Sequence, residues 1–230
     1  MLDWRIGDVN GEGVLDTVYL YGQLDGPPGI FAENITLVIL DGWSNKSTTV
    51  KLKNNAGYNA GLFLGDFNRD NVADIMVSID TGGSGGYGIF YIYSFRNNLL
   101  QELFNIDKYN EEYTFDVNYV DFYKVRVENS KFNLLFIIDI SEKGADYLSQ
   151  FYDEAGLLKN PVKGGVLALA ALNPTITNSK SCNYDLVALQ RIIGTTNADT
   201  LGYVENLLTW QDTQLLSSRL TVSLLGNHLT

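Results

Sequence analysis

The feature that most constrains this chain is a loop that occurs twice, 58 residues apart (66 − 8). The segment "GDVNGEGVLD" spans residues 7–16, and "GDFNRDNVAD" spans residues 65–74. A gapless alignment pairs acidic and amide side chains at four positions: Asp8 with Asp66, Asn10 with Asn68, Glu12 with Asp70, and Asp16 with Asp74. A period of this length is typical of stacked supersecondary units.

Neither loop fits a helix-loop-helix calcium hand. That motif requires a bidentate Glu at the twelfth loop position, which is Tyr19 when Asp8 is the first. The segment after Asp16 reads "TVYLYG" and the one after Asp74 reads "IMVSID", both of which have the composition of strands. Each loop therefore joins β structure, which excludes a dockerin-type module as well.

The side chains of both loops suit a hard divalent cation. All are oxygen ligands, and each loop carries three carboxylates, which favours Ca²⁺ over zinc, copper or iron. The sixth loop position is Gly13 in one copy and Asn71 in the other, and both residue types tolerate left-handed backbone. The alternative is a solvated acidic turn. We expect one or two Ca²⁺ ions, with the first site weaker because Glu12 is longer than Asp.

Two fainter copies of the loop follow. Asp121 lies 55 residues beyond Asp66 (121 − 66), in a segment whose cage is interrupted by Tyr123, Lys124 and Arg126. Asp185 lies 111 residues beyond Asp74 (185 − 74), or two periods, and is preceded by hydroxyls where carboxylates are needed, namely Thr177, Ser179 and Ser181. The sequence thus predicts four repeats, at residues 1–57, 58–113, 114–164 and 165–230, the last two without intact cages.

Each repeat carries about four strand signals; in the first they are "DWRI", "TVYLY", "NITLVIL" and "TTVKLK". Repeated four-stranded antiparallel sheets arranged radially make a β-propeller. We therefore predict an all-β chain forming a single domain over residues 1–230, a small β-propeller of four blades. Five blades are the alternative if residues 121–185 contain an extra sheet. "EKGADYLSQFYD" is expected to be a short helical or irregular insert.

With this pattern the chain resembles the FG-GAP or VCBS repeat, which builds the calcium-loaded propeller blades of integrin α heads and of many bacterial proteins. It is also similar to uncharacterised VCBS-repeat proteins of spore-forming bacteria. The resemblance implies calcium ligands at Asp8, Asn10, Glu12 and Asp16, and at Asp66, Asn68, Asp70 and Asp74, completed by the backbone carbonyls of Val14 and Val72. It does not supply an activity, because propellers host both enzymes and binding proteins.

The charge balance excludes some partners. The formal net charge is −11, so nucleic acid and anionic membranes are disfavoured. No apolar run approaches the roughly 18 residues that a membrane span needs. No signal peptide is visible at the start, and the location is left open. Calcium loops with affinities of about 10⁻⁵ to 10⁻³ M would suit an extracellular, cell-surface or spore-surface site.

Signals for catalysis are weak. "GGSGG" around Ser84 matches a nucleophile elbow, but a strand follows it rather than the required helix. The single histidine, His228, is expected to be a solvated tail residue, and the single cysteine, Cys182, a plain thiol. Paired carboxylates remain able to do acid–base work, although their spacing singles out no pair. The sequence therefore favours a protein without catalytic residues.

The chain contains 14 tyrosines, with clusters at Tyr19/Tyr21, Tyr87/Tyr91/Tyr93 and Tyr119/Tyr123. Exposed aromatics can stack on sugars or anchor a protein, whereas tyrosine is also an ordinary strand residue. The first hypothesis is a calcium-stabilised, non-catalytic binding or adhesion module that presents one face to a protein or glycan. The alternative is a polysaccharide-acting hydrolase or lyase with a propeller fold.

Overall fold

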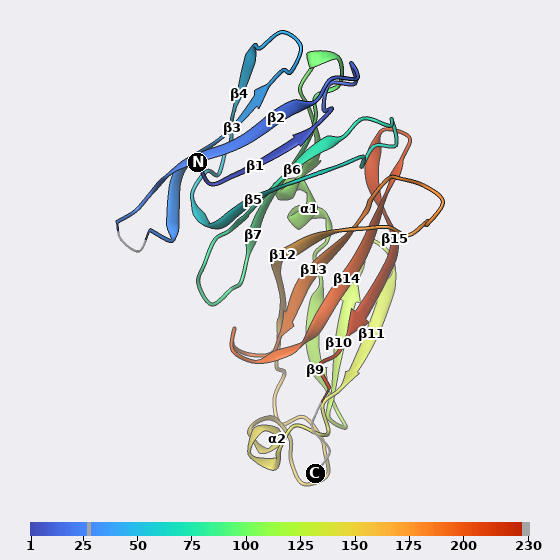
Figure 1. Cartoon of the computed structure of the whole chain (residues 1–230). Coiled ribbons are helices and arrows are strands. Elements are labelled where there is room, and N and C mark those ends of the chain that lie inside the picture. The colour runs from blue at the N-terminus through green and yellow to red at the C-terminus, as the bar shows by residue number, and fades with distance from the viewer. Residues whose placement is uncertain (27–28, 227–230) are drawn as a thin grey trace.

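The computed structural model describes residues 1–26 and 29–226, and within them almost every element is a strand. Alternation of apolar and polar residues produces these strands; in β2, for example, Val18 and Leu20 are buried while Tyr19 and Tyr21 point the other way. The sheets are antiparallel and none closes into a barrel (Figure 1). The all-β class predicted from the sequence is confirmed.

The strands form four antiparallel meanders, named here in chain order. The first contains β1 (Asp3–Gly7), β2 (Asp16–Leu24), β3 (Phe31–Leu40) and β4 (Ser47–Lys51). The second contains β5 (Gly57–Gly65), β6 (Asp74–Asp80), β7 (Gly88–Ser94) and β8 (Gln101–Asn105). The start of β3 also pairs with β5, which joins these two meanders in one eight-stranded sheet.

The third meander has three strands: β9 (Asp116–Val120), β10 (Lys124–Asn129) and β11 (Leu134–Asp139). The fourth has four: β12 (Gly165–Thr175), β13 (Asp185–Ile193), β14 (Thr200–Gln211) and β15 (Gln214–Ser223). Two short helices, α1 (Ile106–Glu112) and α2 (Ala145–Phe151), lie between meanders, and α2 falls in the predicted helical insert. Each meander lies within one predicted repeat to within one residue.

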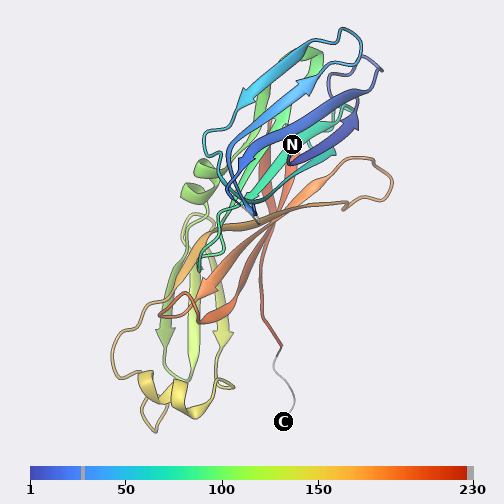
Figure 2. The same cartoon turned by 60° about the vertical axis from the view of Figure 1, so that its left-hand side comes forward.

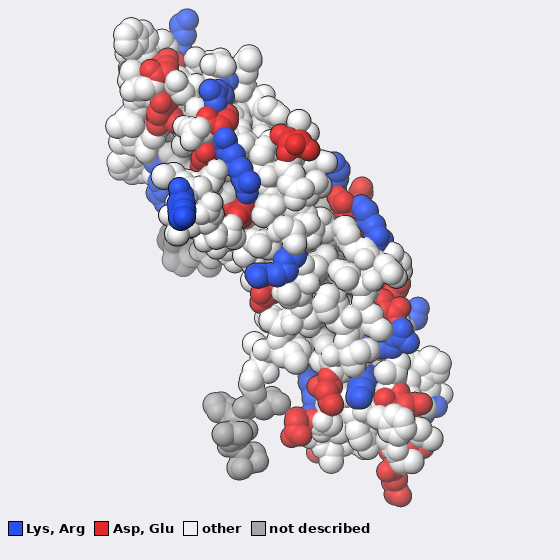
Figure 3. All heavy atoms as spheres, turned by 90° about the vertical axis from the view of Figure 1, so that its right-hand side faces the viewer, with Lys and Arg blue, Asp and Glu red and all other residues white. Residues whose placement is uncertain are grey.

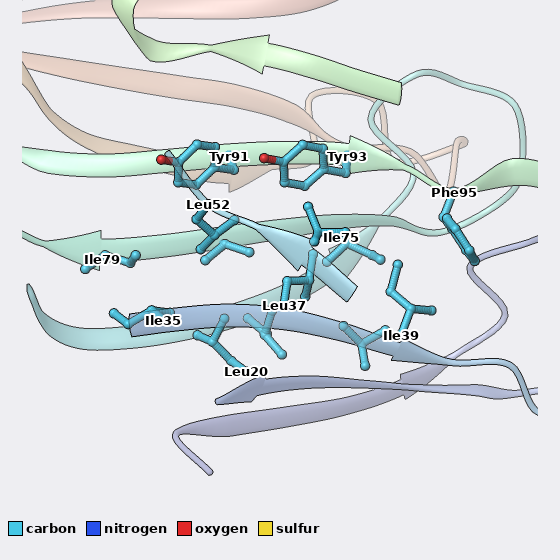
Figure 4. Packing of buried hydrophobic residues seen from close by; sticks show 14 of the residues in the cluster. Leu20, Ile35, Leu37, Ile39, Leu52, Ile75, Ile79, Tyr91, Tyr93 and Phe95 are labelled. Atoms are coloured by element: carbon cyan, nitrogen blue, oxygen red, sulfur yellow. The ribbon is translucent and has the colours of Figure 1, made fainter. Parts of the chain in front are cut away.

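Three apolar clusters hold the meanders face to face. The first lies between the first and second meanders and includes Leu37 and Ile75 (Figure 4). The second joins the other face of the second meander, α1 and the fourth meander. The third joins the fourth and third meanders and includes Val127 and Val204. The spatial order is therefore first, second, fourth, third, in an elongated body (Figures 1 and 2).

The prediction of a degenerate metal loop after Asp121 is wrong. A short turn follows Asp121, and the strand β10 occupies residues 124–129, where the rest of the loop was expected. The physical reason is the alternation in this segment: Val125 and Val127 are fully buried while Lys124 and Arg126 are exposed. The Asp121 carboxylate instead accepts the backbone N–H of Leu158, at 2.8 Å.

Candidate metal loops and binding face

The two predicted metal loops lie side by side at one end of the eight-stranded sheet. One connects β1 to β2 and the other connects β5 to β6. The Ala73 N–H donates to the Asp8 carbonyl at 3.3 Å, and the Asn97 N–H donates to the Asn10 carbonyl at 2.8 Å. A side chain at Gly11 would meet Val72 at 2.9 Å, which also shows how closely the loops approach.

In the second loop the side chains bend the backbone into a tight curl. The Asp66 carboxylate accepts the N–H groups of Asp70 at 3.1 Å and Asn71 at 3.0 Å, and Asn68 Oδ1 also accepts from Asp70. Asn71 adopts φ 63°, the left-handed conformation expected from the sequence. Each accepting oxygen has a second lone pair that remains available to a cation.

Asp74 is the most unusual group in this loop. It is fully buried, and one carboxylate oxygen accepts the N–H groups of Phe67 at 2.8 Å and Asn68 at 3.2 Å. The other oxygen, Oδ1, is buried and makes no hydrogen bond of normal length and angle in the described residues, although the Ser94 hydroxyl is close enough to lower the pKa of Asp74. The pKa of Asp74 is raised to about 7, chiefly by burial and to a lesser extent by the charge of Asp70, against hydrogen bonds from Phe67, Asn68 and Ser94 that lower it. An unpartnered buried carboxylate oxygen is costly, and a bound cation would relieve that cost.

The donor set of the second loop fits a calcium ion in its chemistry, with three carboxylates and one amide. One ligand has a competing partner: the Arg96 guanidinium lies 3.2 Å from Asp70 Oδ2 and also donates to the Asp70 carbonyl at 2.7 Å. Arg96 is about half exposed, so it can move to solvent without losing a buried contact. The donor set therefore suits the ion in its chemistry, with Asp70 shared between the ion and Arg96, although the three carboxylates of this loop do not all lie within 4.8 Å of one another.

The first loop repeats this pattern but leaves fewer oxygens without a partner. Asp8 accepts the N–H groups of Gly11 at 2.7 Å and Gly13 at 2.9 Å. Asp16 is fully buried, as Asp74 is, yet both its oxygens are satisfied, one by Val9 N–H at 3.0 Å and the other by Gly42 N–H at 2.9 Å. Asn10 Oδ1 accepts from Glu12 N–H.

Sequence reasoning missed one acidic residue beside this loop. Carboxylate oxygens of Glu12, Asp16 and Asp41 lie within 4.8 Å of one another, and no other three carboxylates of the described residues come this close together. Backbone N–H groups, chiefly that of Ser44, hold the pKa of Asp41 below its ordinary value. No local sequence pattern could reveal Asp41, because its position depends on strand pairing. Thr17 pairs with Leu40 across β2 and β3, so Asp41 lies directly opposite Asp16.

The fourth meander shows what replaces a metal loop when the carboxylates are lost. Asp185 occupies the place of Asp74 at the start of its strand and is nearly fully buried. Arg69, from the second loop, reaches its Oδ1 at 3.1 Å, and the Thr177 hydroxyl donates to the other oxygen. The loops also meet through the backbone, since Tyr184 N–H donates to the Asp66 carbonyl at 2.8 Å. In this repeat, whose loop the sequence predicts to lack an intact cage, the Arg69 guanidinium supplies positive charge beside Asp185.

The predicted tyrosine clusters divide by burial. Tyr91, Tyr93 and Tyr119 are buried, and Figure 4 shows the first two over the apolar cluster of the first and second meanders. Tyr19 and Tyr21 instead stack, with ring centroids 5.6 Å apart, on the side of β2 that faces away from that cluster. Trp4 is paired with Tyr19 across β1 and β2 and is about half exposed.

We name this surface the outer face of the first meander, after its residues Trp4, Ile6, Thr17, Tyr19, Tyr21, Thr36, Val38, Leu40 and Thr49. These nine residues carry no charge, in a protein with a net charge of −11, and the exposed Lys51, paired with Thr36, lies at their edge. Elsewhere the signs are mixed: the side drawn in Figure 3 shows acidic and basic groups interspersed. The outer face is thus an exposed aromatic and aliphatic surface that begins where the first loop ends.

Two other predicted features can be placed. Ser84 lies in the loop between β6 and β7, where its carbonyl accepts Arg191 at 2.6 Å, so the "GGSGG" segment joins two strands. Cys182 is an exposed free thiol. His228 lies outside the described residues. None of the helices in the described part of the chain has the length and apolarity to cross a membrane.

Comparison with known proteins identifies the family of this chain. Residues 113–223, the third and fourth meanders, match the family described as the YybI C-terminal domain. The uncharacterized protein YybI of Bacillus subtilis (strain 168) is 41% identical over 225 residues, which cover 97% of this chain and 85% of that protein. No solved structure matches. The chain belongs to the YybI family.

Proposed function

We propose that this protein is a calcium-stabilised, non-catalytic binding module of the adhesion type that presents one face to a protein or glycan. The observation that carries the proposal is the buried, unpartnered Oδ1 of Asp74 in a loop of oxygen ligands. A group of this kind is rare in folded proteins, because no bond offsets the free-energy cost of removing it from water. A Ca²⁺ ion would offset that cost and would hold the second loop in its curled form.

In this proposal Asp66, Asn68, Asp70 and Asp74 bind one ion, with the Val72 carbonyl as a further ligand. Asp8, Asn10, Glu12 and Asp16 bind a second ion with the Val14 carbonyl. The proximity of Asp41 to Glu12 and Asp16 supports a cation near the first loop, because three clustered carboxylates repel one another. The satisfied state of Asp16 is consistent with weaker binding there.

We further propose that the four meanders are blade-type units like those of FG-GAP and VCBS propellers. Four antiparallel sheets with loops at equivalent positions support this interpretation. A closed ring of four blades, or of five in the alternative, would require an interface between the first and third meanders. The three apolar clusters of the described residues join the other neighbours and do not include that pair. Ring closure therefore stays a prediction.

The outer face of the first meander is the proposed binding surface. Stacked or exposed aromatics such as Trp4 and Tyr21 bind sugar rings or protein side chains through large, rigid contacts. Threonine hydroxyls on the same face, including Thr36 and Thr49, supply hydrogen bonds to a polar partner. The loops at the end of this sheet would keep the face rigid while calcium is bound.

The test is a glycan array and a protein-capture screen in calcium, compared with Trp4→Ala and Tyr21→Ala variants. We expect the variants to lose about tenfold or more in affinity, the cost of removing one aromatic anchor. Trp43→Ala is the matched control, because Trp43 is 76% exposed but lies in the turn between β3 and β4. Equal binding by all three variants would move the site to another surface.

The hydrolase or lyase hypothesis is kept as the alternative. A general acid needs a carboxyl with a raised pKa that a substrate can reach. Asp74 has the raised pKa but is fully buried, and Asp41 has a lowered one. Turnover of any polysaccharide in the same screen would support this alternative over the binding module.

A further inference from the structure

The third meander is the exception in strand number, and its last strand has a free edge. The other three meanders have four strands each, whereas the third has three, namely β9, β10 and β11. Within residues 1–26 and 29–226, no strand pairs with the outer edge of β11. The opposite edge, along β9, is covered: Tyr119 N–H donates to the Val162 carbonyl and Gly164 N–H to the Val117 carbonyl, both at 3.0 Å.

Burial across this small sheet shows the same asymmetry. The core-facing residues of β9 and β10 are buried; Val117 and Val127, for example, are 3% and 0% exposed. On β11 the core-facing Leu134 and Phe136 are only partly buried, while Ile138 at the end of the strand is buried at 3% exposure. On its other side, Leu135 and Ile137 are 52% and 51% exposed. A further strand along β11 would complete the burial of Leu134 and Phe136 and would cover part of Leu135 and Ile137.

The backbone of β11 is ready to accept such a strand. Ile140 N–H donates to the Tyr123 carbonyl at 2.8 Å, which fixes the alternation of hydrogen-bonded pairs between β10 and β11. By that alternation the N–H and C=O groups of Leu135 and Ile137 point away from β10. Natural edge strands usually carry charges, proline or a bulge that prevent pairing. The segment 132–138, "FNLLFII", has no charge and no proline.

We propose that β11 pairs with β11 of a second copy of this chain, in antiparallel register centred on Phe136, to form a six-stranded sheet. The sequence "LLFII" at residues 134–138 is apolar on both sides of its centre, so it is complementary to itself when reversed. Leu135 then lies opposite Ile137 of the other copy, and both have outward-pointing backbone groups, as this register requires.

Charge restricts where a second copy can pair. Two chains of net charge −11 repel each other over most of their surfaces, and approach is cheapest along an uncharged segment. In the proposed register Asp139, the first charged residue after the apolar segment, falls opposite the amide of Asn133, which can donate to it. Registers displaced toward either end would place Asp139 or the turn opposite apolar residues instead.

The first test is the oligomeric state of the full chain by sedimentation velocity, at constant calcium, over a concentration series. The interface is small, so we expect a dimer with a dissociation constant on the order of 10⁻⁵ M. Ile137→Lys should raise that constant about tenfold or more, because the lysine loses apolar contact and blocks the edge. The matched control is Ile176→Lys, since Ile176 is 54% exposed and follows β12. A protein that stays monomeric, or a dimer that Ile137→Lys leaves intact, overturns the proposal.

The second test reads the register directly. In a Cys182→Ser background, Leu135→Cys protein mixed with Ile137→Cys protein should form a disulfide-linked heterodimer, since directly opposed residues lie within disulfide range. Each variant alone should link far less, because its own cysteines are two positions out of register. Equal linking of all three samples would contradict the proposed register. Both tests are independent of calcium binding, so their failure leaves the proposed function untouched.

Discussion

Asp74 and Asp185 stand at the same place in two meanders, the first residue of the second strand, and both are buried. Around Asp185, a guanidinium and a hydroxyl from this chain, Arg69 and Thr177, meet both carboxylate oxygens. Around Asp74 one oxygen makes no hydrogen bond of normal geometry, and the side chains that influence it are the Asp70 carboxylate and the Ser94 hydroxyl. The comparison teaches that this fold keeps a buried carboxylate at the loop end and has to supply partners for both of its oxygens. Side chains supply them for Asp185, and we propose that a metal ion supplies the missing one for Asp74.

The largest effect is expected from removing the second-loop carboxylate. Asp74→Ala should lower the free energy of unfolding by about 3 kcal/mol in calcium, because two buried N–H groups lose their acceptor and the proposed ion loses a ligand. Urea unfolding monitored by circular dichroism measures the loss. Asp80→Ala is the control, an exposed carboxylate at the other end of the same strand, and should cost well under about 1 kcal/mol. Equal losses would mean that the loop position is not special.

Chelation should have the next largest effect. Binding to the folded state alone adds about 2.7 kcal/mol when calcium is at 100 times its dissociation constant, so EDTA should lower the melting temperature by several degrees. Asp70→Ala should remove most of this response, since Asp70 is the loop's middle carboxylate. A melting curve indifferent to EDTA, together with no heat of calcium binding in titration calorimetry, would reduce both loops to acidic turns.

Removing the guanidinium from the fourth meander should cost somewhat less. Arg69→Ala leaves the nearly buried Asp185 with Thr177 as its remaining side-chain partner, and we expect a loss of about 2 kcal/mol. The response to EDTA should persist, because Arg69 contributes no proposed ligand. Arg69→Lys should recover part of the stability by restoring the charge. Stability that is unchanged in Arg69→Ala would show that Asp185 finds solvent or another donor.

These two sites differ in how far the sequence could predict them. The loop residues, from Asp66 to Asp74, follow a spacing that is local and can be counted along the chain. The Arg69–Asp185 pair joins residues 116 positions apart, and the approach of Asp41 to Asp16 depends on strand register. No local pattern carries such information, because it arises only when sheets pack.

The fold shows the same limit. Four repeats of strands could be read from alternating residues and turn signals, and the all-β class followed from them. The order of the meanders in space, with the fourth between the second and the third, depends on which faces share an apolar cluster. The error at β10 came from extending a metal-loop alignment over "KVRV", whose alternation is the stronger signal.

The smallest effect per step of the experiment, and the most specific to the comparison, is a dependence on pH. In EDTA, burial raises the pKa of Asp74 from an ordinary 3.8 to about 7, so between these values the folded protein holds a proton that the unfolded chain has released. Stability should therefore fall as pH rises through this window, by about 1.4 kcal/mol per pH unit at most. Asp41 and Asp139, whose pKa values are lowered, act in the opposite sense and below about pH 4, outside the window.

With calcium bound, Asp74 is ionised in both states and the decline should disappear. Asp74→Asn, which has no proton to release, should show no calcium-dependent difference in slope. Urea unfolding at a series of pH values, with EDTA and with calcium, measures both slopes. A profile in EDTA that does not decline toward neutral pH would show that Asp74 is paired as fully as Asp185, and the contrast between the two meanders would fail.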